Sequence, residues 1–242
     1  MRRDRAAGAK KNEIKPWLRE QWCIPPEADA EFVCQMEDVL DGYHRPYDPK
    51  RPLVCLDEAS RQLIGEVVQP IPAGPGQPER FDYEYVRNGT ANLFMAFEPL
   101  LGWRAVQVTE RRTAKDFAAV MRWLVEDVHE DAEKVVLVVD NLNTHKPASF
   151  YEAFPPEQAR RIAERIEWPY TPKHGSWLNM AEIELSVLER QALGPRIEGR
   201  EQMARVTGAW EEERNERGVE VKWRFTTADA RIKLHKLYPS LQ

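Results

Sequence analysis

No stretch of this 242-residue sequence is apolar for long enough to cross a membrane. A membrane-spanning helix needs roughly 20 consecutive apolar residues, and no run approaches that length. The N-terminus, MRRDRAAGAKK, also lacks the apolar segment of a signal peptide. We therefore expect a soluble cytoplasmic protein with no membrane partner, and a hydrophobic content of 42% fits a globular chain.

Cysteine is scarce and arranged without a pattern. The three cysteines, Cys23, Cys34 and Cys55, show neither CxxC spacing nor a paired histidine, and their odd number argues against a disulfide framework. We expect ordinary buried thiols.

A general excess of positive charge is also missing, since the formal net charge is −5. The charge is nevertheless uneven, because residues 1 to 20 carry a net +4. A basic arm of this kind can follow a phosphate backbone, and it can equally be a solvated start of the chain. Pro16, Pro25 and Pro26 then indicate an extended connector, which leads into a helix predicted over 28–40.

The most informative stretch is VVLVVDNLNTHK, residues 135–146. Five apolar residues without alternation are typical of a strand buried on both faces of a parallel or mixed sheet. The strand ends in Asp140, and a polar loop follows. Because α/β sheets place their chemistry at the carboxyl ends of such strands, Asp140 is a candidate site residue, with the turn-capping role as its alternative.

A second short strand ending in an acid is predicted at LVCLDEAS, where Leu53 to Leu56 precede Asp57. We expect Glu58 to Ser60 to form a tight connection and residues 61–68 to return as an antiparallel neighbour. Residues 69–82 contain four prolines and form a loop that is long enough to be functional or mobile. Further strands are predicted around 90–99 and 103–110.

Helices dominate the rest of the chain. We predict an amphipathic helix over 113–128 with Thr113 as its N-cap, short helices after Pro147 and over 156–165, and a brief strand at 166–168. A helix capped by Asn179 follows, with Glu182 at capping-box spacing, and the tail from Arg200 is helical.

This order of elements predicts a ribonuclease-H-like α/β fold, with a mixed central sheet of about five strands flanked by helices. In that topology the first and fourth strands lie side by side, so Asp57 and Asp140 would end next to each other. We expect three regions. Residues 1–50 form the arm, connector and one helix, 51–195 form the catalytic domain, and 196–242 form a helical extension.

Two carboxylates held side by side repel one another, and a divalent cation between them relieves that repulsion. Carboxylate oxygens suit Mg²⁺ or Mn²⁺. A third acid from a neighbouring helix would complete a two-metal site for in-line phosphoryl displacement, and Glu182 and Glu184 are both candidates.

Three blocks of the sequence resemble the signature motifs of the DDE transposases of bacterial insertion sequences in the IS 630 family, within the Tc/mariner superfamily. The blocks are LVCLDEAS, VVLVVDNLNTHK and YTPKHGSWLNMAEIELSVL. The family's last block reads Ser-Trp-Leu-Asn-x-x-Glu, which falls here on Ser176, Trp177, Leu178, Asn179 and Glu182. The resemblance therefore selects Glu182 over Glu184, and it implies that Asp57, Asp140 and Glu182 hold two Mg²⁺ or Mn²⁺ ions.

The sequence also departs from the family pattern. The 41 residues between Asp140 and Glu182 exceed the usual mariner interval, which this family can enlarge. Full-length relatives begin with a helix-turn-helix region, and nothing of that kind precedes Trp17. We expect the catalytic half alone, as a truncated copy, a second reading frame, or a fragment that works with a separate DNA-binding half.

Several residues beside the triad are candidates for DNA contact. Lys173 and His174 could meet phosphates, and a solvated loop is the alternative. Trp177 could stack on a base, although anchoring the helix start is the stronger interpretation. His145 could fix its loop, meet a phosphate or ligate a metal, and Asn141 belongs to the same loop. Glu58 is interpreted as an ion-pair partner.

Three functions remain open at this stage. The first is a transposase catalytic domain that cleaves transposon ends and joins them to target DNA. The resemblance implies that the target is a TA step and that the active form is a homodimer, which would be nucleoid-associated when bound to DNA. The second is a nuclease of the same fold that only hydrolyses. The third is a non-catalytic, truncated transposase that inhibits by binding DNA or a partner.

Overall fold

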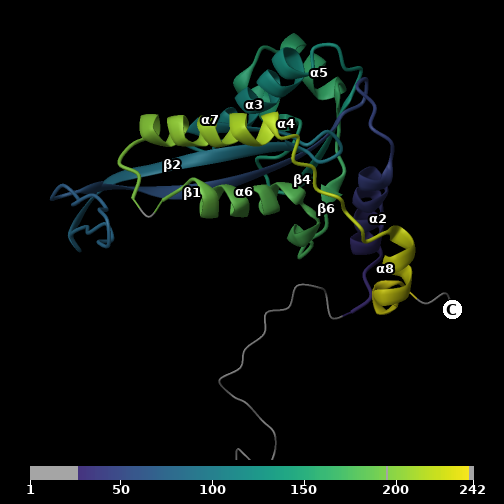
Figure 1. Cartoon of the computed structure of the whole chain (residues 1–242). Helices are drawn as coiled ribbons and strands as arrows, with labels where there is room; N and C mark the ends of the chain where they lie inside the picture. Colours follow the sequence, from purple (N-terminus) through teal and green to yellow (C-terminus); the bar gives the residue numbers. More distant parts are fainter. Residues whose placement is uncertain (1–26, 195, 240–242) are drawn as a thin grey trace, which may run out of the picture.

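The computed structural model describes residues 27–194 and 196–239 (Figure 1). The predicted basic arm, the connector with its three prolines and Cys23 lie outside the described residues. The first described helix, α2, spans Ala30–His44 and is capped by Asp29, whose carboxylate accepts hydrogen bonds from the amides of Glu31 and Phe32.

A mixed sheet forms the centre of the molecule. Its strand order is β3-β2-β1-β4-β5, and β6 pairs with β4. The pairs β1–β2 and β2–β3 are antiparallel, whereas β4 runs parallel to β1, β5 and β6. The bounds are β1 Leu53–Glu66, β2 Tyr85–Glu98, β3 Trp103–Thr109, β4 Val135–Asp140, β5 Ile166–Glu167 and β6 Tyr170–Thr171. The predicted ribonuclease-H-like fold is confirmed, with six strands where about five were expected.

The sequence interpretation of β1 was wrong. We predicted a strand that ends before Asp57, a turn at 58–60 and an antiparallel return over 61–68, but β1 is one strand of 14 residues. Its antiparallel neighbour is β2, and the two pair from Cys55–Phe97 to Glu66–Tyr85 with one irregularity between Gln62 and Ile64. The change from buried to polar residues after Leu56 marks the point where the strand leaves the buried centre of the sheet, not its end.

Alternate residues of the central strands pack into two separate cores. Val54, Leu56, Leu137 and Val139 face helices α3, α4 and α5. Leu53, Cys55, Val136 and Val138 face the layer that contains α2, α6, α7 and α8. The bounds are α3 Ala114–Arg122, α4 Ala148–Ala153, α5 Pro156–Glu164, α6 Met180–Gln191, α7 Arg200–Glu216 and α8 Thr227–Lys233. Elements on both sides of the predicted 51–195 segment therefore share its core.

Most predicted helices are present at the expected places. Thr113 caps α3 through a capping box with Asp116. The expected helix over 113–128 continues past Arg122 as a π-helix, Trp123–Val128. Pro147 and Pro155 immediately precede α4 and α5. The short strand β6 was not predicted, because two residues after a proline carry no periodic signal.

Helix α7 covers the open edge of the sheet, along β3. The Asn215 side chain accepts a hydrogen bond from the Arg104 amide at 2.9 Å and donates one to the Arg104 carbonyl at 2.7 Å. The Glu211 carboxylate accepts from the Val106 amide at 2.9 Å. These side chains replace a missing neighbouring strand, which protects the edge from pairing with another chain.

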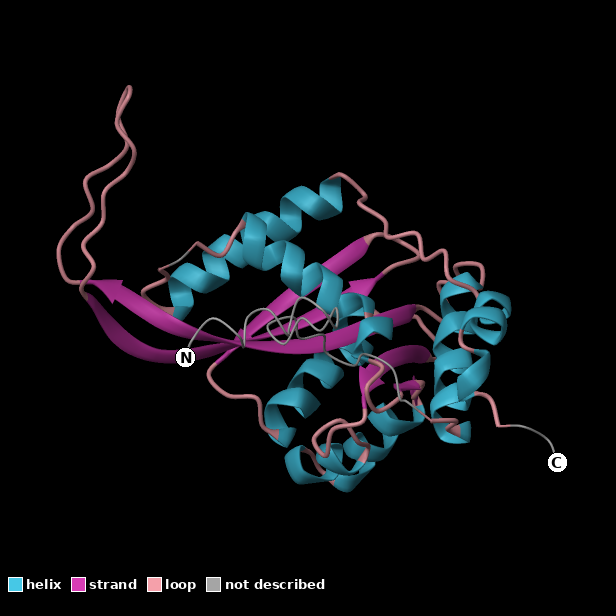
Figure 2. Cartoon of the chain, turned by 90° about the horizontal axis from the view of Figure 1, so that it is seen from below, coloured by secondary structure: helices cyan, strands magenta, loops and turns pink. Residues whose placement is uncertain are grey.

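The segment 67–84 projects from the ends of β1 and β2 as an arm (Figures 1 and 2). Only two isolated bridges, Ile71–Arg80 and Gly74–Gln77, join its two sides. The arm exposes large apolar side chains, among them Ile71 at 61% and Tyr83 at 83%. Arg196 lies over the Phe81 ring at its base. Within the described residues, no helix is long and apolar enough to cross a bilayer.

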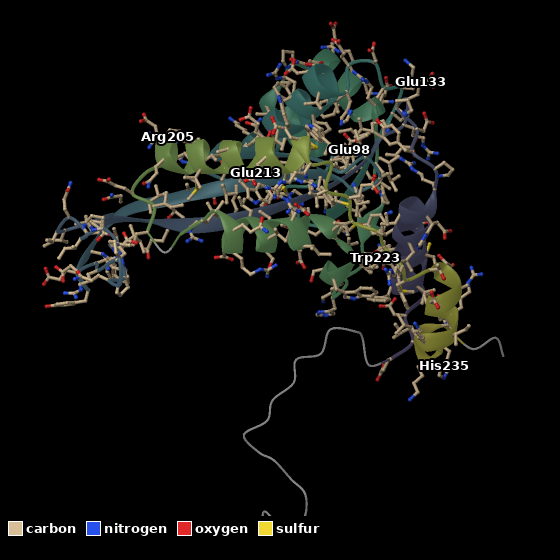
Figure 3. The ribbon with its side chains drawn as sticks, viewed as in Figure 1. Glu98, Glu133, Arg205, Glu213, Trp223 and His235 are labelled. Atoms are coloured by element: carbon tan, nitrogen blue, oxygen red, sulfur yellow. The ribbon has the colours of Figure 1, made fainter. Side chains whose placement is uncertain are left out.

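A buried acid–base pair lies at the end of β2, where Figure 3 labels Glu98. Glu98 Oε1 is 3.4 Å from His129 Nε2, and Glu98 Oε2 has no hydrogen-bond partner among the described residues. Burial raises the pKa of Glu98 to about 7. Burial, together with the positive charge of Arg165, lowers the pKa of His129 to about 4. Tyr47 and Trp103 are the other neighbours.

The two groups should have opposite effects on stability. An acid with a raised pKa lowers the free energy of unfolding as pH rises from its unfolded value near 4.5 to about 7, whereas a histidine with a lowered pKa raises it between about 4 and 6.5. In Glu98→Gln only the histidine effect remains. We predict that this variant gains stability over wild type between pH 5 and 7.5, by up to roughly 3 kcal/mol.

Urea unfolding at several pH values measures this difference. His129→Gln is the matched control and should show the opposite trend, losing stability relative to wild type as pH rises. Stability curves that run parallel for all three proteins would show that the pair does not titrate in this range.

Candidate active site

The parallel register of β1 and β4 places Asp57 beside Asp140. Leu53 pairs with Val136, Val54 with Leu137, and Cys55 with Val138. Two residues further along each strand, the same register sets Asp57 opposite Asp140. Because side chains alternate between the faces of a sheet, both aspartates occupy strand positions on the face of Cys55 and Val138. The Asp140 carboxylate itself is turned toward His145, whose ring packs on Phe117 of the other core.

Helix α6 packs on this same face and carries Glu182 in its first turn. Leu178, Met180 and Ala181 are buried in the core shared with Cys55 and Val138. Asn179 caps the helix by accepting a hydrogen bond from the Ala181 amide. The predicted capping box does not form, since the Glu182 side chain is exposed and does not return to the Asn179 amide. Its carboxylate is therefore left available near the aspartates.

Mutual repulsion among these acids changes the proton affinity of Asp57. Burial raises the pKa of Asp57 to about 7, with a contribution from the negative charges of Glu182, Asp140 and Glu58, although a hydrogen bond from the Glu58 amide lowers it. The carboxylates of Glu182 and Asp140 are thus close enough to Asp57 to act on it electrostatically. Such a cluster of acids is the kind of site that a divalent cation stabilises.

The chemistry of the donors fits Mg²⁺ or Mn²⁺, because all three side chains offer hard carboxylate oxygens. Within the described part of the chain, however, no three His, Cys, Asp or Glu side chains already converge on a single point. One reason is visible in the contacts of Asp140, whose carboxylate is hydrogen-bonded to His145 Nδ1. Ion binding would require the carboxylates to turn inward from these positions.

His145 is buried between two acids. Its Nδ1 contacts Asp140 Oδ1, its Nε2 lies 2.9 Å from Glu58 Oε1, and its ring packs on Phe117. Burial by itself would lower the pKa of His145, but the hydrogen bonds to Asp140 and Glu58 raise it to about 9. The ring is therefore cationic near neutral pH, and it orients the Asp140 carboxylate while balancing part of the acidic charge.

Two grooves border the acidic cluster. The larger, of about 520 Å³, includes Asp140, Asn141, Lys173 and His174 among its lining residues. The other, of about 370 Å³, is lined in part by Asp57, Glu182 and Arg61. The sequence candidates Asn141, Lys173 and His174 are exposed along the first groove, whereas His145 is only 1% exposed. DNA contact by these residues stays a prediction.

The loop that carries Lys173 and His174 has an unusual backbone. His174 has a φ of 65°, in the left-handed region that residues other than glycine rarely adopt. Gly175 follows, and a Cβ atom there would lie 2.5 Å from the Pro172 ring. The loop is thus folded tightly against itself, which holds the His174 side chain at the groove.

Trp177 lies outside the groove and packs on aromatic residues. Its ring stacks on Trp223 with centroids 6.3 Å apart and meets Phe225 edge-on. These contacts fit its interpreted role as an anchor for the start of α6. Its indole N–H is buried and has no hydrogen-bond partner within the described residues.

Glu184 has a different environment from Glu182, although both are on α6. Its side chain is 1% exposed and pairs with two arginines. Arg214 of α7 donates two hydrogen bonds to it at 2.9 and 3.2 Å, and Arg104 Nε of β3 lies 3.2 Å from Glu184 Oε2. Glu184 is therefore a structural ion-pair partner that joins α6 to α7 and β3, which supports the selection of Glu182.

Sequence reasoning missed several of these contacts. The arginines that surround Glu184 lie 80 and 30 residues away from it in the chain, so no local pattern points to them. Tyr43, whose hydroxyl donates to the Leu178 carbonyl at 2.5 Å, was also missed. Glu58 was interpreted as an ion-pair partner, but the identity of that partner, His145, emerges only from the fold.

A mixed sheet with acids at neighbouring positions on its two central parallel strands, and a further acid on a helix packed beside them, defines a ribonuclease-H-like protein with an acidic site. Residues 52–204, more than half of the chain, match the family model described as DDE superfamily endonuclease. The chain belongs to that family. Among curated proteins, none matches this sequence closely enough to count as a relative.

Solved structures of the Mos1 transposase share the fold. The paired-end complex with left transposon end aligns at a TM-score of 0.51 and 15% identity, covering 89% of this chain and 66% of that one. The Strand Transfer Complex aligns at 0.51 and 16%, covering 88% and 65%. The mariner Mos1 paired end complex with Mg aligns at 0.50 and 16%, covering 90% and 71%. This chain thus spans about two thirds of the Mos1 chain, and the likeness concerns the fold alone.

The two glutamates of α6 should respond differently to substitution. Glu184→Gln removes the charge that two arginines share, and breaking such a buried pair destabilises a protein by roughly 3–5 kcal/mol. Glu182→Gln changes an exposed side chain, so we expect its stability to stay within about 0.5 kcal/mol of wild type. Thermal and urea unfolding of the two variants test this. Equal destabilisation by both substitutions would contradict the assignment.

Proposed function

We propose that this chain is the catalytic domain of a DNA transposase of the IS 630 family in the Tc/mariner superfamily, which cleaves transposon ends and transfers them to target DNA. The observation that carries the proposal is the register that sets Asp57 beside Asp140, on the face where α6 presents Glu182. The three motif blocks add support, because their acids come from distant parts of the sequence to one face of the sheet. We assign residues 51–195 to the catalytic domain, 1–50 to the preceding basic arm, connector and helix, and 196–242 to a helical extension, and the helices α2, α7 and α8 of the two flanking regions complete the core of the catalytic domain.

In this proposal Asp57, Asp140 and Glu182 would hold two Mg²⁺ or Mn²⁺ ions. When bound, such ions activate the attacking oxygen and stabilise the leaving oxygen of an in-line phosphoryl displacement. Asp57, as the central acid, would contribute to both ion sites. In this proposal the chain positions carboxylates and needs no covalent intermediate, so catalysis rests on positioning and charge.

Residues around the acids would position the DNA. Lys173 and His174 line the larger groove beside Asp140, where a cation can contact a backbone phosphate. Asn141 lies in the same groove. His145 would act through Asp140 by fixing the direction of its carboxylate. The DNA partners would be the transposon ends and a target, which by resemblance is a TA step. Trp177 would support the start of α6 through its stacking on Trp223, more than it would stack on a base.

Two alternatives make distinct predictions. A ribonuclease-H-like nuclease would use the same site for hydrolysis alone, so it would cut DNA without joining a 3′-hydroxyl end to a target. A non-catalytic inhibitor would bind DNA or a partner and need no metal. The hydrogen bond between Asp140 and His145 distinguishes the inhibitor from the two enzymes. If the protein is a non-catalytic inhibitor, the Asp140 carboxylate should keep this hydrogen bond even when divalent ions are present.

A comparison of Mn²⁺ binding by the wild-type chain and by Asp140→Ala tests the proposal. With a short oligonucleotide duplex present, we expect Mn²⁺ binding by the wild-type chain in calorimetry and a loss of at least about tenfold in affinity in Asp140→Ala, because a charged ligand is gone. Glu184→Gln serves as the control, since it alters the same helix without removing a proposed ligand. Absence of Mn²⁺ binding by the wild type would overturn the catalytic proposal.

Strand-transfer and cleavage assays then distinguish a transposase from a nuclease that only hydrolyses DNA. Wild type should join a labelled 3′-hydroxyl end to plasmid DNA, and Asp140→Ala should lose both cleavage and joining. Cleavage without joining would support the hydrolytic nuclease.

We propose further that the active complex is a homodimer. The exposed apolar side chains of the projecting segment 67–84 support this proposal, since such a patch on a projecting element is typical of a contact surface. In that case Ile71→Ser with Tyr83→Ser should weaken self-association by about tenfold or more without changing thermal stability. Light scattering over a concentration series measures the effect. Ile232→Ser, at an equally exposed apolar residue on α8, is the matched control.

A further inference from the structure

One buried side chain, that of Asn179, connects strand β1, which carries Asp57, to helix α6, which carries Glu182. Asn179 is 3% exposed, and its amide nitrogen donates a hydrogen bond to the Leu56 carbonyl at 2.8 Å. Its amide oxygen accepts from the backbone N–H of Ala181 at 3.1 Å. Both ends of the same amide group are therefore bonded to backbone atoms.

The positions of these backbone atoms give the contact its meaning. Leu56 immediately precedes Asp57 on β1, and Ala181 immediately precedes Glu182 on α6. The Asn179 amide thus spans the gap between the strand and the helix next to both acids. An amide is suited to this task because it offers a donor and an acceptor in one rigid plane.

We propose that Asn179 is a positioning residue that sets the distance between Asp57 and Glu182, so that both carboxylates can hold the same pair of divalent cations. This inference rests on the proposed function, and it assigns to Asn179 a role beyond that of a helix cap.

Glu182 depends on its backbone for position. Its side chain is exposed and takes part in no hydrogen bond or ion pair among residues 27–194 and 196–239. Within the described part of the chain, Asp57 likewise has no side-chain partner and accepts a hydrogen bond from the Glu58 amide alone. When two ligands are not held by their own side chains, the placement of the strand and the helix determines how far apart they lie.

The segment before Asn179 is fixed independently of the amide. The Tyr43 hydroxyl of α2 donates to the Leu178 carbonyl at 2.5 Å. Trp177 stacks on Trp223, which Figure 3 labels beside the start of α6. These contacts should keep the loop folded when the Asn179 side chain is shortened, so that the spacing of the acids can be tested in a folded protein.

The experiment compares Asn179→Ser and Asn179→Ala with wild type. Serine is as good an N-cap as asparagine but is too short to reach the Leu56 carbonyl, whereas alanine lacks both functions. We expect the two variants to lose Mn²⁺ affinity equally, by about 10- to 100-fold, as is typical when a residue that orients metal ligands is removed. Asn179→Ala should melt at a lower temperature than Asn179→Ser, because only alanine loses the cap.

Control variants separate positioning from general destabilisation. Ile162 lies on α5, which packs on the opposite face of the sheet. Ile162→Val and Ile162→Ala should lower stability by two different amounts, the alanine variant by more. They should bind Mn²⁺ within about twofold of wild type over a range of melting temperatures that brackets that of Asn179→Ser. Calorimetry with the same duplex present gives affinities for all five proteins.

The outcomes are distinct. If wild type binds Mn²⁺ and Asn179→Ser binds it within about twofold as well, the positioning role is overturned while the proposed function stands. The role is also overturned if an Ile162 variant of equal stability loses as much affinity. If wild type binds no Mn²⁺, the proposed function fails and the role of Asn179 fails with it.

Discussion

The parallel pairing of β1 with β4 is the constraint on which the rest of the molecule depends. A slip of one residue in that register would turn every β4 side chain to the opposite face, and Asp140 would then point away from Asp57. The register is held from both sides, because Val54 and Leu137 pack under α3 to α5 while Cys55 and Val138 pack under α2 and α6. Two hydrophobic cores thus determine where two charged groups meet.

Bringing acids together at this place creates a repulsion that the surrounding residues relieve only in part. Burial is the main cause that raises the pKa of Asp57 to about 7, and the negative charges of Glu182, Asp140 and Glu58 add to it. The cationic ring of His145 relieves part of the repulsion, between Asp140 and Glu58. Glu184 has the opposite environment, since it forms ion pairs with two arginines within the core. Helix α6 therefore carries one acid that is held in buried ion pairs and, two residues earlier, one exposed acid, Glu182, that we propose as a metal ligand.

The sequence predicts the fold class well because its strongest signals are local. The unbroken apolar run of β4, the Thr113 cap and the Asn179 cap each involve neighbouring residues, and all three are present in the structure. The length of β1 could not be predicted in the same way. Among the described strands its outer half pairs with β2 alone, and residues 57–62 are mostly polar, so the change at Asp57 resembled a strand end. His145 and the partners of Glu184 depend on long-range contacts, which no spacing in the sequence reveals.

The site is built from backbone more than from side-chain contacts, and this bears on how a divalent ion could be accommodated. Asp140 is oriented by His145, whereas Asp57 and Glu182 have no side-chain partner among residues 27–194 and 196–239 to release before they turn toward an ion. Among the described residues, only Asp140 must therefore release a side-chain partner, and the ring it leaves keeps its second bond to Glu58. The strand and the helix meanwhile stay joined through the Asn179 amide. Ion binding would thus require the acidic side chains to rotate, on a strand and a helix that the Asn179 amide already joins.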